Sequence, residues 1–516
     1  MEKRYRIFFL LPACSFFLTA LNAQKTNIAA AHAHSPSIPV IKGLATNPIL
    51  QVIVSVPAGV STQQFTSAQC TLKSFVDIER INVYLTGAGP FSADSLIGST
   101  IPTANTFDIP IRLSATPGTC FVWLSVVLKK DADISGTVEL HCLRLVATGK
   151  RSLPVVEDAS VAPRLTGTAI RKSGDDGVNT YRIPGIIQTD RGTLVAVYDV
   201  RYKDSKDLPA NIDVGMSRST DSGKTWEPMR IIMDMGAPHD RNGIGDPCLL
   251  FDPATKKIFV AALWSKGNHA IAGSMPGLSP DSTGQFMLVS SADDGVNWTA
   301  PYSLTPLVKE PAWHIFFQGP GAGIAMKNGT IVFPAQYWDE KKLPYSTIIY
   351  SKDHGLSWHG KITGPKSNTT ESQVVETMPG TLLLNMRDNR GGFRSIASTT
   401  DMGAHWTEHP GSFNALADPV CMGSIIKTKV NTAPGNKADV LFFSNPAVSS
   451  GRYNITIKAS LDLGETWKKT NQLLIDERNS YGYSCLTGID ANTVAILYEG
   501  IKDLYFVRVP VKKIIQ

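Results

Sequence analysis

One eight-residue pattern, Ser/Thr-x-Asp-x-Gly-x-x-Trp, occurs five times in the C-terminal part of this 516-residue chain. Each copy follows a run of β-forming residues, so it is typical of a hairpin turn. Asp would accept backbone N–H bonds, Gly would take a positive φ, and Trp would fold back over the strands. Successive copies lie 48 to 72 residues apart, which suits the four-stranded blades of a β-propeller. The copies occupy residues 219–226, 291–298, 351–358, 399–406 and 460–467.

The region from Leu165 to the C-terminus has room for six units of this size. We therefore expect a six-bladed propeller over 161–516, with one blade lacking the repeat and the two ends of the region paired to close the ring. The repeat could instead be a calcium loop, because Asp293-Asp294-Gly295 superficially resembles one. Each copy offers only one or two carboxylates and no distal glutamate, which is too few calcium ligands. We predict a scaffold role without a metal ion.

The N-terminal part has a different pattern. Residues 24–160 lack the repeat, but strand-like runs at 49–56, 107–113 and 120–128 alternate with turns rich in Gly, Pro, Ser and Thr. This pattern predicts a β-sandwich domain, followed by a linker around 151–163. The predicted fold class is therefore all-β.

The first residues have the features of a secretory signal peptide. Basic residues precede an apolar run that ends at Leu21, and we expect cleavage after Ala23. Residues 1–23 would then be removed, leaving a protein that is secreted, periplasmic or held at the cell surface. Cys14 could alternatively be a lipidation site, although the apolar run continues past it. No later stretch approaches the length of a membrane span.

Charge and cysteine spacing exclude several classes of protein. The formal charge of +6 falls to +4 without residues 1–23, a mild excess that suits a polyanionic partner. No Lys/Arg run indicates nucleic-acid binding. The remaining six cysteines lack the C-x-x-C spacing of a zinc site. Cys120 could pair with Cys142 in an oxidising compartment, but buried free thiols fit the sequence equally well.

A motif at the start of the propeller region, Tyr181-Arg182-Ile183-Pro184, resembles the Phe/Tyr-Arg-Ile-Pro motif of bacterial sialidases of the Asp-box type. The resemblance extends over about residues 165–510. It implies an exo-α-sialidase, a hydrolase that removes terminal sialic acids from glycoproteins, glycolipids and oligosaccharides. A single arginine in a four-residue motif would otherwise be an ordinary surface residue.

The resemblance implies that Arg182 is one of three arginines that bind the sialic acid carboxylate. The other two map to Arg387 and Arg452. Planar guanidinium groups suit this task because they form bidentate, charge-assisted hydrogen bonds. Glu499 resembles the family's carboxylate that holds the first arginine, and its other interpretation, a salt bridge at a strand end, differs little from that role.

The loop after the strand expected at 193–198 supplies candidate acids. By resemblance, Asp207 is the acid/base residue and Arg201 is a further substrate-binding arginine near the O4 side of the sugar. Asp204 on the same loop is the alternative acid, and we expect partial burial to raise the pKa of the true one. Asp246 resembles a substrate-contacting aspartate, although an aspartate before Pro247 also suits a simple turn.

Tyr483 matches the family's catalytic tyrosine and Glu371 matches the glutamate that activates it. A neutral phenol suits this substrate, because a carboxylate nucleophile would be repelled by the carboxylate on the reacting carbon. Tyr481 and Glu376 are the neighbouring alternatives. These roles predict a retaining hydrolysis that needs no metal or organic cofactor.

Two other functions could use the same scaffold. A sialic-acid-binding lectin would keep the arginines without needing the catalytic groups, and a trans-sialidase or an enzyme releasing an anhydro product would use the same residues. We predict glycan binding for the N-terminal domain only because such domains accompany sialidase propellers. Trp123 and Tyr84 could stack on sugars, but core packing is at least as good an explanation.

Overall fold

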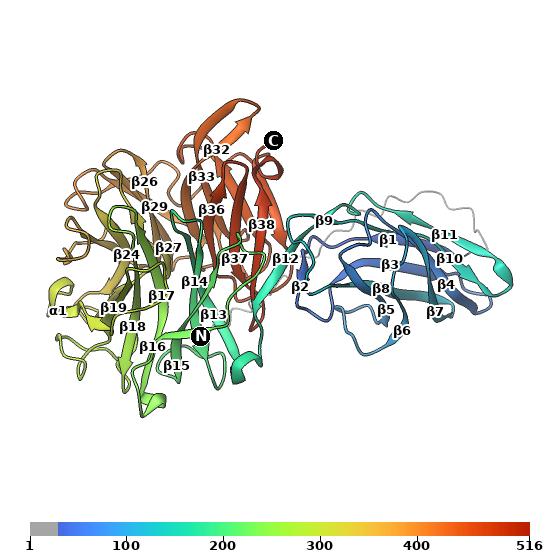
Figure 1. Ribbon diagram of the computed structural model, residues 1–516, viewed down its shortest axis with the longest axis horizontal. Coiled ribbons are helices and arrows are strands. Elements are labelled where there is room, and N and C mark those ends of the chain that lie inside the picture. Colours follow the sequence, from blue (N-terminus) through green and yellow to red (C-terminus); the bar gives the residue numbers. More distant parts are fainter. Residues whose placement is uncertain (1–28) are drawn as a thin grey trace, which may run out of the picture.

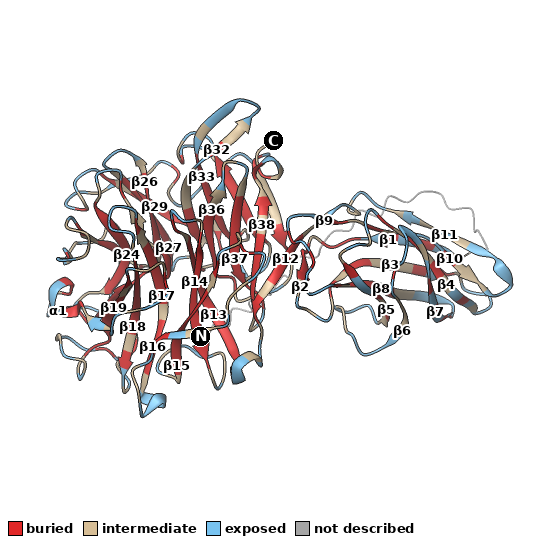
Figure 2. Cartoon of the chain, in the orientation of Figure 1, coloured by how far each residue is buried: buried red, intermediate tan, exposed pale blue. Residues whose placement is uncertain are grey.

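The computed structural model describes residues 29–516, and its regular secondary structure is almost entirely β-strand (Figure 1). A propeller and a smaller N-terminal barrel lie side by side, and in each the buried residues follow the strands (Figure 2). The predicted signal peptide and the alternative lipidation site at Cys14 lie outside the described residues. Within residues 29–516, no helix has the length and apolar character needed to cross a membrane.

The N-terminal domain is a closed barrel of nine strands around one apolar core. In β7 (Thr106–Ala115) alternate side chains are buried, as expected for strands with one face on the core. The predicted strands and core are present, but hydrogen bonds continue from one face of the expected sandwich to the other. The other strands, in order around the barrel, are β6 (Leu96–Thr100), β5 (Ile78–Thr86), β8 (Gly118–Leu128), β3 (Pro48–Val56), β1 (Ala30–His34), β11 (Ser152–Glu157), β10 (Leu140–Ala147) and β4 (Gln63–Leu72).

One detail of the N-terminal prediction is corrected, and an open alternative for two cysteines is decided. The predicted linker 151–163 contains β11, which pairs with β1 and β10, so the connection to the propeller is confined to about 158–163. Leu153 and Val155, two residues apart along β11, both pack against the apolar core, which explains why this stretch joins the barrel. Cys120 and Cys142 are both free thiols and do not form a disulfide.

Six four-stranded blades form the propeller, as predicted from the repeat. The first blade contains β13 (Thr180–Gln188), β14 (Leu194–Arg201), β15 (Ile212–Ser219) and β16 (Arg230–Met233), and the second contains β17 (Asn242–Asp252), β18 (Lys257–Lys266), β19 (Gln285–Ser291) and β20 (Tyr302–Ser303). The third blade contains β21 (Ile315–Gln318), β23 (Ile324–Ala325), β24 (Ile331–Trp338) and β25 (Pro344–Ser351), and the fourth contains β26 (Thr369–Met378), β27 (Thr381–Asp388), β29 (Ser395–Thr399) and β30 (Thr407–Glu408). The fifth blade contains β32 (Ser424–Ala433), β33 (Asn436–Pro446), β34 (Ile455–Ser460) and β35 (Gln472–Asp476), and the sixth contains β36 (Ser484–Asp490), β37 (Thr493–Glu499), β38 (Leu504–Pro510) and β12 (Arg164–Arg171).

The last blade closes the ring by combining the two ends of the propeller region. Its outer strand β12 precedes the first blade in sequence and pairs antiparallel with β38, which confirms the predicted closure. Two short strands of the N-terminal part, β2 (Val40–Lys42) and β9 (Thr137–Val138), also pair with β12. Backbone hydrogen bonds therefore join the N-terminal part directly to the last blade.

Each of the five repeats starts at the last residue of a strand, namely β15, β19, β25, β29 or β34. In the first copy the Ser219 hydroxyl donates to Asp221, and the backbone N–H of Gly223 donates back to Ser219. Gly223 has a φ of +85°, and a Cβ there would meet the ring of Phe506 at 2.2 Å, so only glycine fits. Hydrogen bonds from Ser357 lower the pKa of the repeat carboxyl of Asp353 to about 2. The carboxylates thus fasten the turns, in keeping with a scaffold role.

Candidate active site

A pocket of about 270 Å³ lies where the inner ends of several blades converge. The contributing side chains lie on the first or second strand of a blade or on a loop beside one, so the propeller brings together residues far apart in sequence. The predicted residues that line the pocket are Arg182, Asp207, Asp246, Glu371, Arg387, Arg452 and Tyr483. The two remaining predicted residues, Arg201 and Glu499, lie behind this lining.

Glu499 lies behind the pocket lining and accepts hydrogen bonds from residues that line it. Its carboxylate is 0% exposed and accepts a hydrogen bond from Arg182 Nε at 3.1 Å. It also accepts the backbone N–H groups of Ile183 and Tyr483, each at 2.9 Å. A buried carboxylate with three donors is well satisfied. Glu499 therefore fixes Arg182 and the backbone at Tyr483, and does not itself reach the pocket.

Tyr483 and Glu371 are in direct contact. The phenol hydroxyl donates to Glu371 Oε1 at 2.5 Å, and Arg387 Nη1 donates to Glu371 Oε2 at 2.8 Å and to the phenol oxygen at 3.1 Å. Burial, and then the negative charge of Glu371, raise the pKa of Tyr483 well above its ordinary value. The phenol is therefore neutral and has an adjacent acceptor for its proton.

Three guanidinium groups surround the Tyr483 side chain. Arg452 donates to the backbone carbonyls of Tyr481 and Val420, at 2.9 and 3.3 Å, and its guanidinium carbon lies 5.6 Å from the centre of the Tyr483 ring. Arg182 lies 5.4 Å from the same ring. Together with Arg387, these groups form a cluster of positive charge that suits an anion in the pocket. The structure thus places the predicted arginine triad in one cavity.

Asp207 forms ion pairs with two arginines. Its Oδ1 accepts from Arg201 Nη1 at 2.7 Å and from Arg182 Nη1 at 3.2 Å, while its side chain remains 72% exposed. Partial desolvation alone would raise the pKa of Asp207, but the two guanidinium groups lower it below the usual value. The expected rise in pKa is therefore wrong for this arrangement. The alternative acid, Asp204, pairs with Lys206 outside the pocket lining.

Arg201 and Asp246 are connected through a buried carboxylate that the sequence did not single out. Asp199 accepts from Arg201 Nε and Nη2 at 3.1 and 2.8 Å, and from the backbone N–H of Asp246 at 2.8 Å. Arg201 is only 1% exposed, and its guanidinium group donates to both Asp199 and Asp207. Burial, followed by repulsion from Asp199 and Asp207, raises the pKa of Asp246 well above the ordinary value.

One wall of the pocket, contributed by the first three blades, is largely apolar. It is formed by Leu208, Leu263, Ile271 and Trp338, with Gln336 beside them. Gln336 is 2% exposed, and its Nε2 has no hydrogen-bond partner among the residues that the structure describes. These residues could not be recognised from the sequence, because Leu263, Gln336 and Trp338 lie in apolar strands typical of a core and Leu208 and Ile271 lie on loops without a motif. Within residues 29–516, no group of three His, Cys, Asp or Glu side chains could hold a metal ion.

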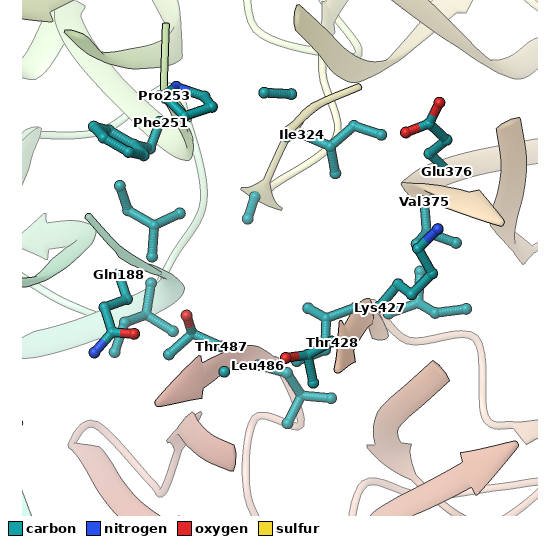
Figure 3. Close-up of a pocket in the computed structure, with 18 of the residues that line it drawn as sticks. Gln188, Phe251, Pro253, Ile324, Val375, Glu376, Lys427, Thr428, Leu486 and Thr487 are labelled. Carbon is teal, nitrogen blue, oxygen red and sulfur yellow. The ribbon is translucent and has the colours of Figure 1, made fainter. Parts of the chain in front are cut away.

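A second cavity, of about 480 Å³, lies at the opposite ends of the same inner strands (Figure 3). Glu376 and Lys427 stand among mainly apolar side chains there. Glu376 accepts the backbone N–H groups of Lys327 and Gly380, each at 2.9 Å. Glu376, the alternative to Glu371, is therefore at the wrong end of its strand to meet Tyr483.

Comparisons with known proteins show similarity to sialidases along most of the chain. A family model described as a BNR repeat-like domain matches residues 183–481. A sialidase of Bacteroides fragilis is 45% identical over 409 residues, covering 78% of this chain and 75% of that protein. A sialidase of Micromonospora viridifaciens is 31% identical, covering 65% of this chain and 52% of that protein. The solved structure of a Hadza microbial sialidase, 37% identical, covers 94% of this chain and 100% of its own with a TM-score of 0.86.

Proposed function

The chain belongs to the sialidase family and is an exo-α-sialidase, and from that premise we propose that it acts by a retaining mechanism with Tyr483 as nucleophile. The observation that carries this proposal is the contact between Tyr483 and Glu371 in a pocket that also holds three arginines and Asp207. A neutral phenol beside a proton acceptor can attack a carbon that already carries a carboxylate. The arginines would hold that carboxylate against the phenol.

In the first step, Asp207 in its acid form donates a proton to the glycosidic oxygen as the bond to the leaving group breaks. The oxygen of Tyr483 bonds to the anomeric carbon and passes its proton to Glu371. In the second step, Asp207 removes a proton from water while the water oxygen attacks the anomeric carbon. As that bond forms, the bond from the anomeric carbon to Tyr483 breaks, and the phenol oxygen recovers its proton from Glu371.

A fluorinated substrate analogue tests this mechanism directly. We expect 2,3-difluorosialic acid to inactivate the enzyme and to leave one sugar attached to the peptide that contains Tyr483, as measured by mass spectrometry. Tyr483→Phe should form no such adduct. Attachment to another residue would contradict the proposed nucleophile. NMR of the products would show whether free sialic acid is released with retention, and would distinguish hydrolysis from transfer or formation of an anhydro sugar.

For the N-terminal barrel, we propose glycan binding at its junction with the propeller. Trp123 and Phe91 line a cavity of about 860 Å³ together with Tyr453 and Tyr505 of the propeller. Aromatic faces near polar groups suit sugars, whereas Tyr84 is only 7% exposed and supports Phe91 edge-on at 5.4 Å. Trp123→Ala should weaken retention on mucin without changing kcat on a small sialoside. Unchanged retention would refute the proposal.

We also propose that residues 1–23 direct export, so that the enzyme meets glycoconjugates outside the cytoplasm. The support is the order of basic, apolar and small residues in that segment. Expression in a bacterial host followed by N-terminal sequencing of exported protein should give Gln24 as the first residue. A lipid on Cys14 would instead indicate a lipoprotein.

A further inference from the structure

We propose that Asp199 is a positioning residue that holds the two acidic side chains of the pocket, Asp207 and Asp246, in place. Asp199 lies near the end of β14, is 1% exposed and does not line the pocket. Its carboxylate is nevertheless connected to both acids by separate routes. The inference rests on the proposed role of Asp207 as the acid of the reaction.

The first route passes through Arg201. One edge of its guanidinium group, Nε and Nη2, donates to Asp199 Oδ2 at 3.1 and 2.8 Å. The remaining nitrogen, Nη1, donates to Asp207 Oδ1 and to the carbonyl of Ser205, both at 2.7 Å. A planar guanidinium clamped along one edge cannot rotate, so its other N–H groups point in a fixed direction. Asp199 thereby gives the exposed Asp207 a rigid partner.

The second route is a backbone contact. Asp199 Oδ1 accepts the N–H of Asp246 at 2.8 Å, and the carbonyl of Asp246 accepts from Gln318 Nε2 at 2.6 Å. Asp246 has a φ of +56°, a left-handed conformation that non-glycine residues adopt only when the surroundings hold them there. Two buried side chains, those of Asp199 and Gln318, therefore hold the N–H and the carbonyl of Asp246. The direction in which the Asp246 carboxylate points therefore depends on Asp199.

Close packing at Gly245 supports a fixed carboxylate. A Cβ on Gly245 would lie 2.9 Å from Asp199 Oδ1 and 3.2 Å from its Cγ and Oδ2. Gly245 does not have a positive φ, so the backbone itself would accept alanine. Glycine is required here because the Asp199 carboxylate approaches the chain so closely.

Charge gives Asp199 a second effect on Asp207. The arginines that act on Asp207 are Arg182, Arg201 and Arg452, and the nearby carboxylate is Asp246. Because Arg201 pairs with both Asp199 and Asp207, the negative charge of Asp199 offsets part of the positive charge that Asp207 meets. Without Asp199, Arg201 would pair with Asp207 alone and would favour the ionised form of that residue. Loss of the Asp199 charge should therefore make Asp207 a poorer proton donor.

Asp199→Asn tests the inference, because it keeps the shape and one acceptor but removes the charge. The measurements are kcat and KM on an aryl sialoside and on a sialylated trisaccharide. A sugar leaving group depends strongly on the acid, whereas a phenol leaving group depends on it much less. We expect kcat/KM to fall at least tenfold more on the trisaccharide, and the alkaline limb of its pH profile to move to lower pH. A purely structural role would lower both activities equally.

Three further variants complete the test. Gly245→Ala, which displaces the carboxylate without removing it, should show the same pattern more weakly, and it decides the matter if Asp199→Asn does not fold. Asp252→Asn is the matched control, because Asp252 is a buried aspartate at the other end of β17 with donors from Ala254, Thr255 and His354. It should not change the ratio of the two activities.

Asp207→Ala sets the reference for a missing acid. If it lowers the trisaccharide activity selectively while Asp199→Asn and Gly245→Ala lower both activities equally, the positioning role is overturned. If Asp207→Ala itself lowers both activities equally, the acid role of Asp207 fails, and the inference fails with it.

Discussion

Asp207 and Arg182 form an ion pair within the pocket, with Oδ1 3.2 Å from Nη1. Arg182 is also one of the arginines that we assign to the substrate carboxylate. The two carboxylates, one from the protein and one from the substrate, therefore compete for the same guanidinium group. Binding of the substrate would weaken the hold of Arg182 on Asp207, and this would raise the pKa of the acid when it is needed.

This competition predicts different pH profiles for kcat and kcat/KM. The profile of kcat/KM reports the free enzyme, in which the arginines lower the pKa of Asp207, and that of kcat reports the complex. We expect the alkaline limb of kcat on a sialylated trisaccharide to lie at higher pH than that of kcat/KM. Asp204→Asn, a change on the same loop outside the pocket, should leave both limbs in place. Coincident limbs would show that the substrate does not change the acid.

Tyr483 and Glu371 should behave as one unit. Tyr483→Phe removes the attacking oxygen and Glu371→Gln removes the proton acceptor, so each should lower kcat/KM by about 10²- to 10⁴-fold. The double variant should be little worse than either single one, because the groups act in the same step. Glu376→Gln, at the opposite end of the strand, should keep normal kinetics. Additive losses in the double variant would argue against a shared proton transfer.

Arg452 offers a test of carboxylate binding that is separable from stability. Within residues 29–516 its guanidinium forms no salt bridge and donates only to two backbone carbonyls. Arg452→Lys keeps the charge but loses the bidentate geometry, so we expect KM to rise about 10- to 100-fold with little change in the unfolding midpoint. Arg390→Lys, which alters a pair with Asp388 outside the pocket, is the control. A normal KM in Arg452→Lys would remove this residue from the triad.

Motifs with fixed offsets allowed much of the fold and site to be predicted. The repeated turn and the length of the region after Leu165 together indicated six blades, and the resemblance carried by the motif around Arg182 indicated the residues that the ring brings together. The roles of Asp199 and Gln336 could not be predicted, because both lie in strands and only the three-dimensional contacts distinguish them from core residues. The lowered pKa of Asp207 could not be predicted either, because it depends on Arg182 and Arg201, which only the folded chain brings next to Asp207.

The predicted linker illustrates a different limit. Residues 152–157 are bounded by turn-forming residues and precede Pro163, so their composition fits a connection as well as a strand. They form β11 because β1 and β10 offer two free edges, and a strand gains hydrogen bonds on both sides there. Availability of such edges is a property of the whole barrel that no local pattern contains.

The buried carboxyl of Asp213, which follows the loop of Asp207 in the sequence, should make the stability of the protein depend on pH. Asp213 is 6% exposed and accepts a hydrogen bond from the Tyr202 hydroxyl at 2.9 Å. Burial raises the pKa of Asp213 from 3.8 to about 6. Because folding favours the protonated form, the stability contributed by this group is fully present below pH 3.8 and is lost as the pH rises through about 6. The loss amounts to at most about 3 kcal/mol.

Asp213→Asn should therefore stabilise the protein at neutral pH. The amide is neutral at every pH and can still accept the Tyr202 hydrogen bond, so the cost of burying a charge disappears. We expect a higher midpoint of thermal unfolding than wild type at pH 7.5 and no gain at pH 4, where Asp213 is already protonated. Asp252→Asn removes a buried carboxylate that has three hydrogen-bond donors, and it should lower the midpoint at pH 7.5. An equal gain for Asp213→Asn at both pH values would show that packing, and not the charge of Asp213, determines the effect.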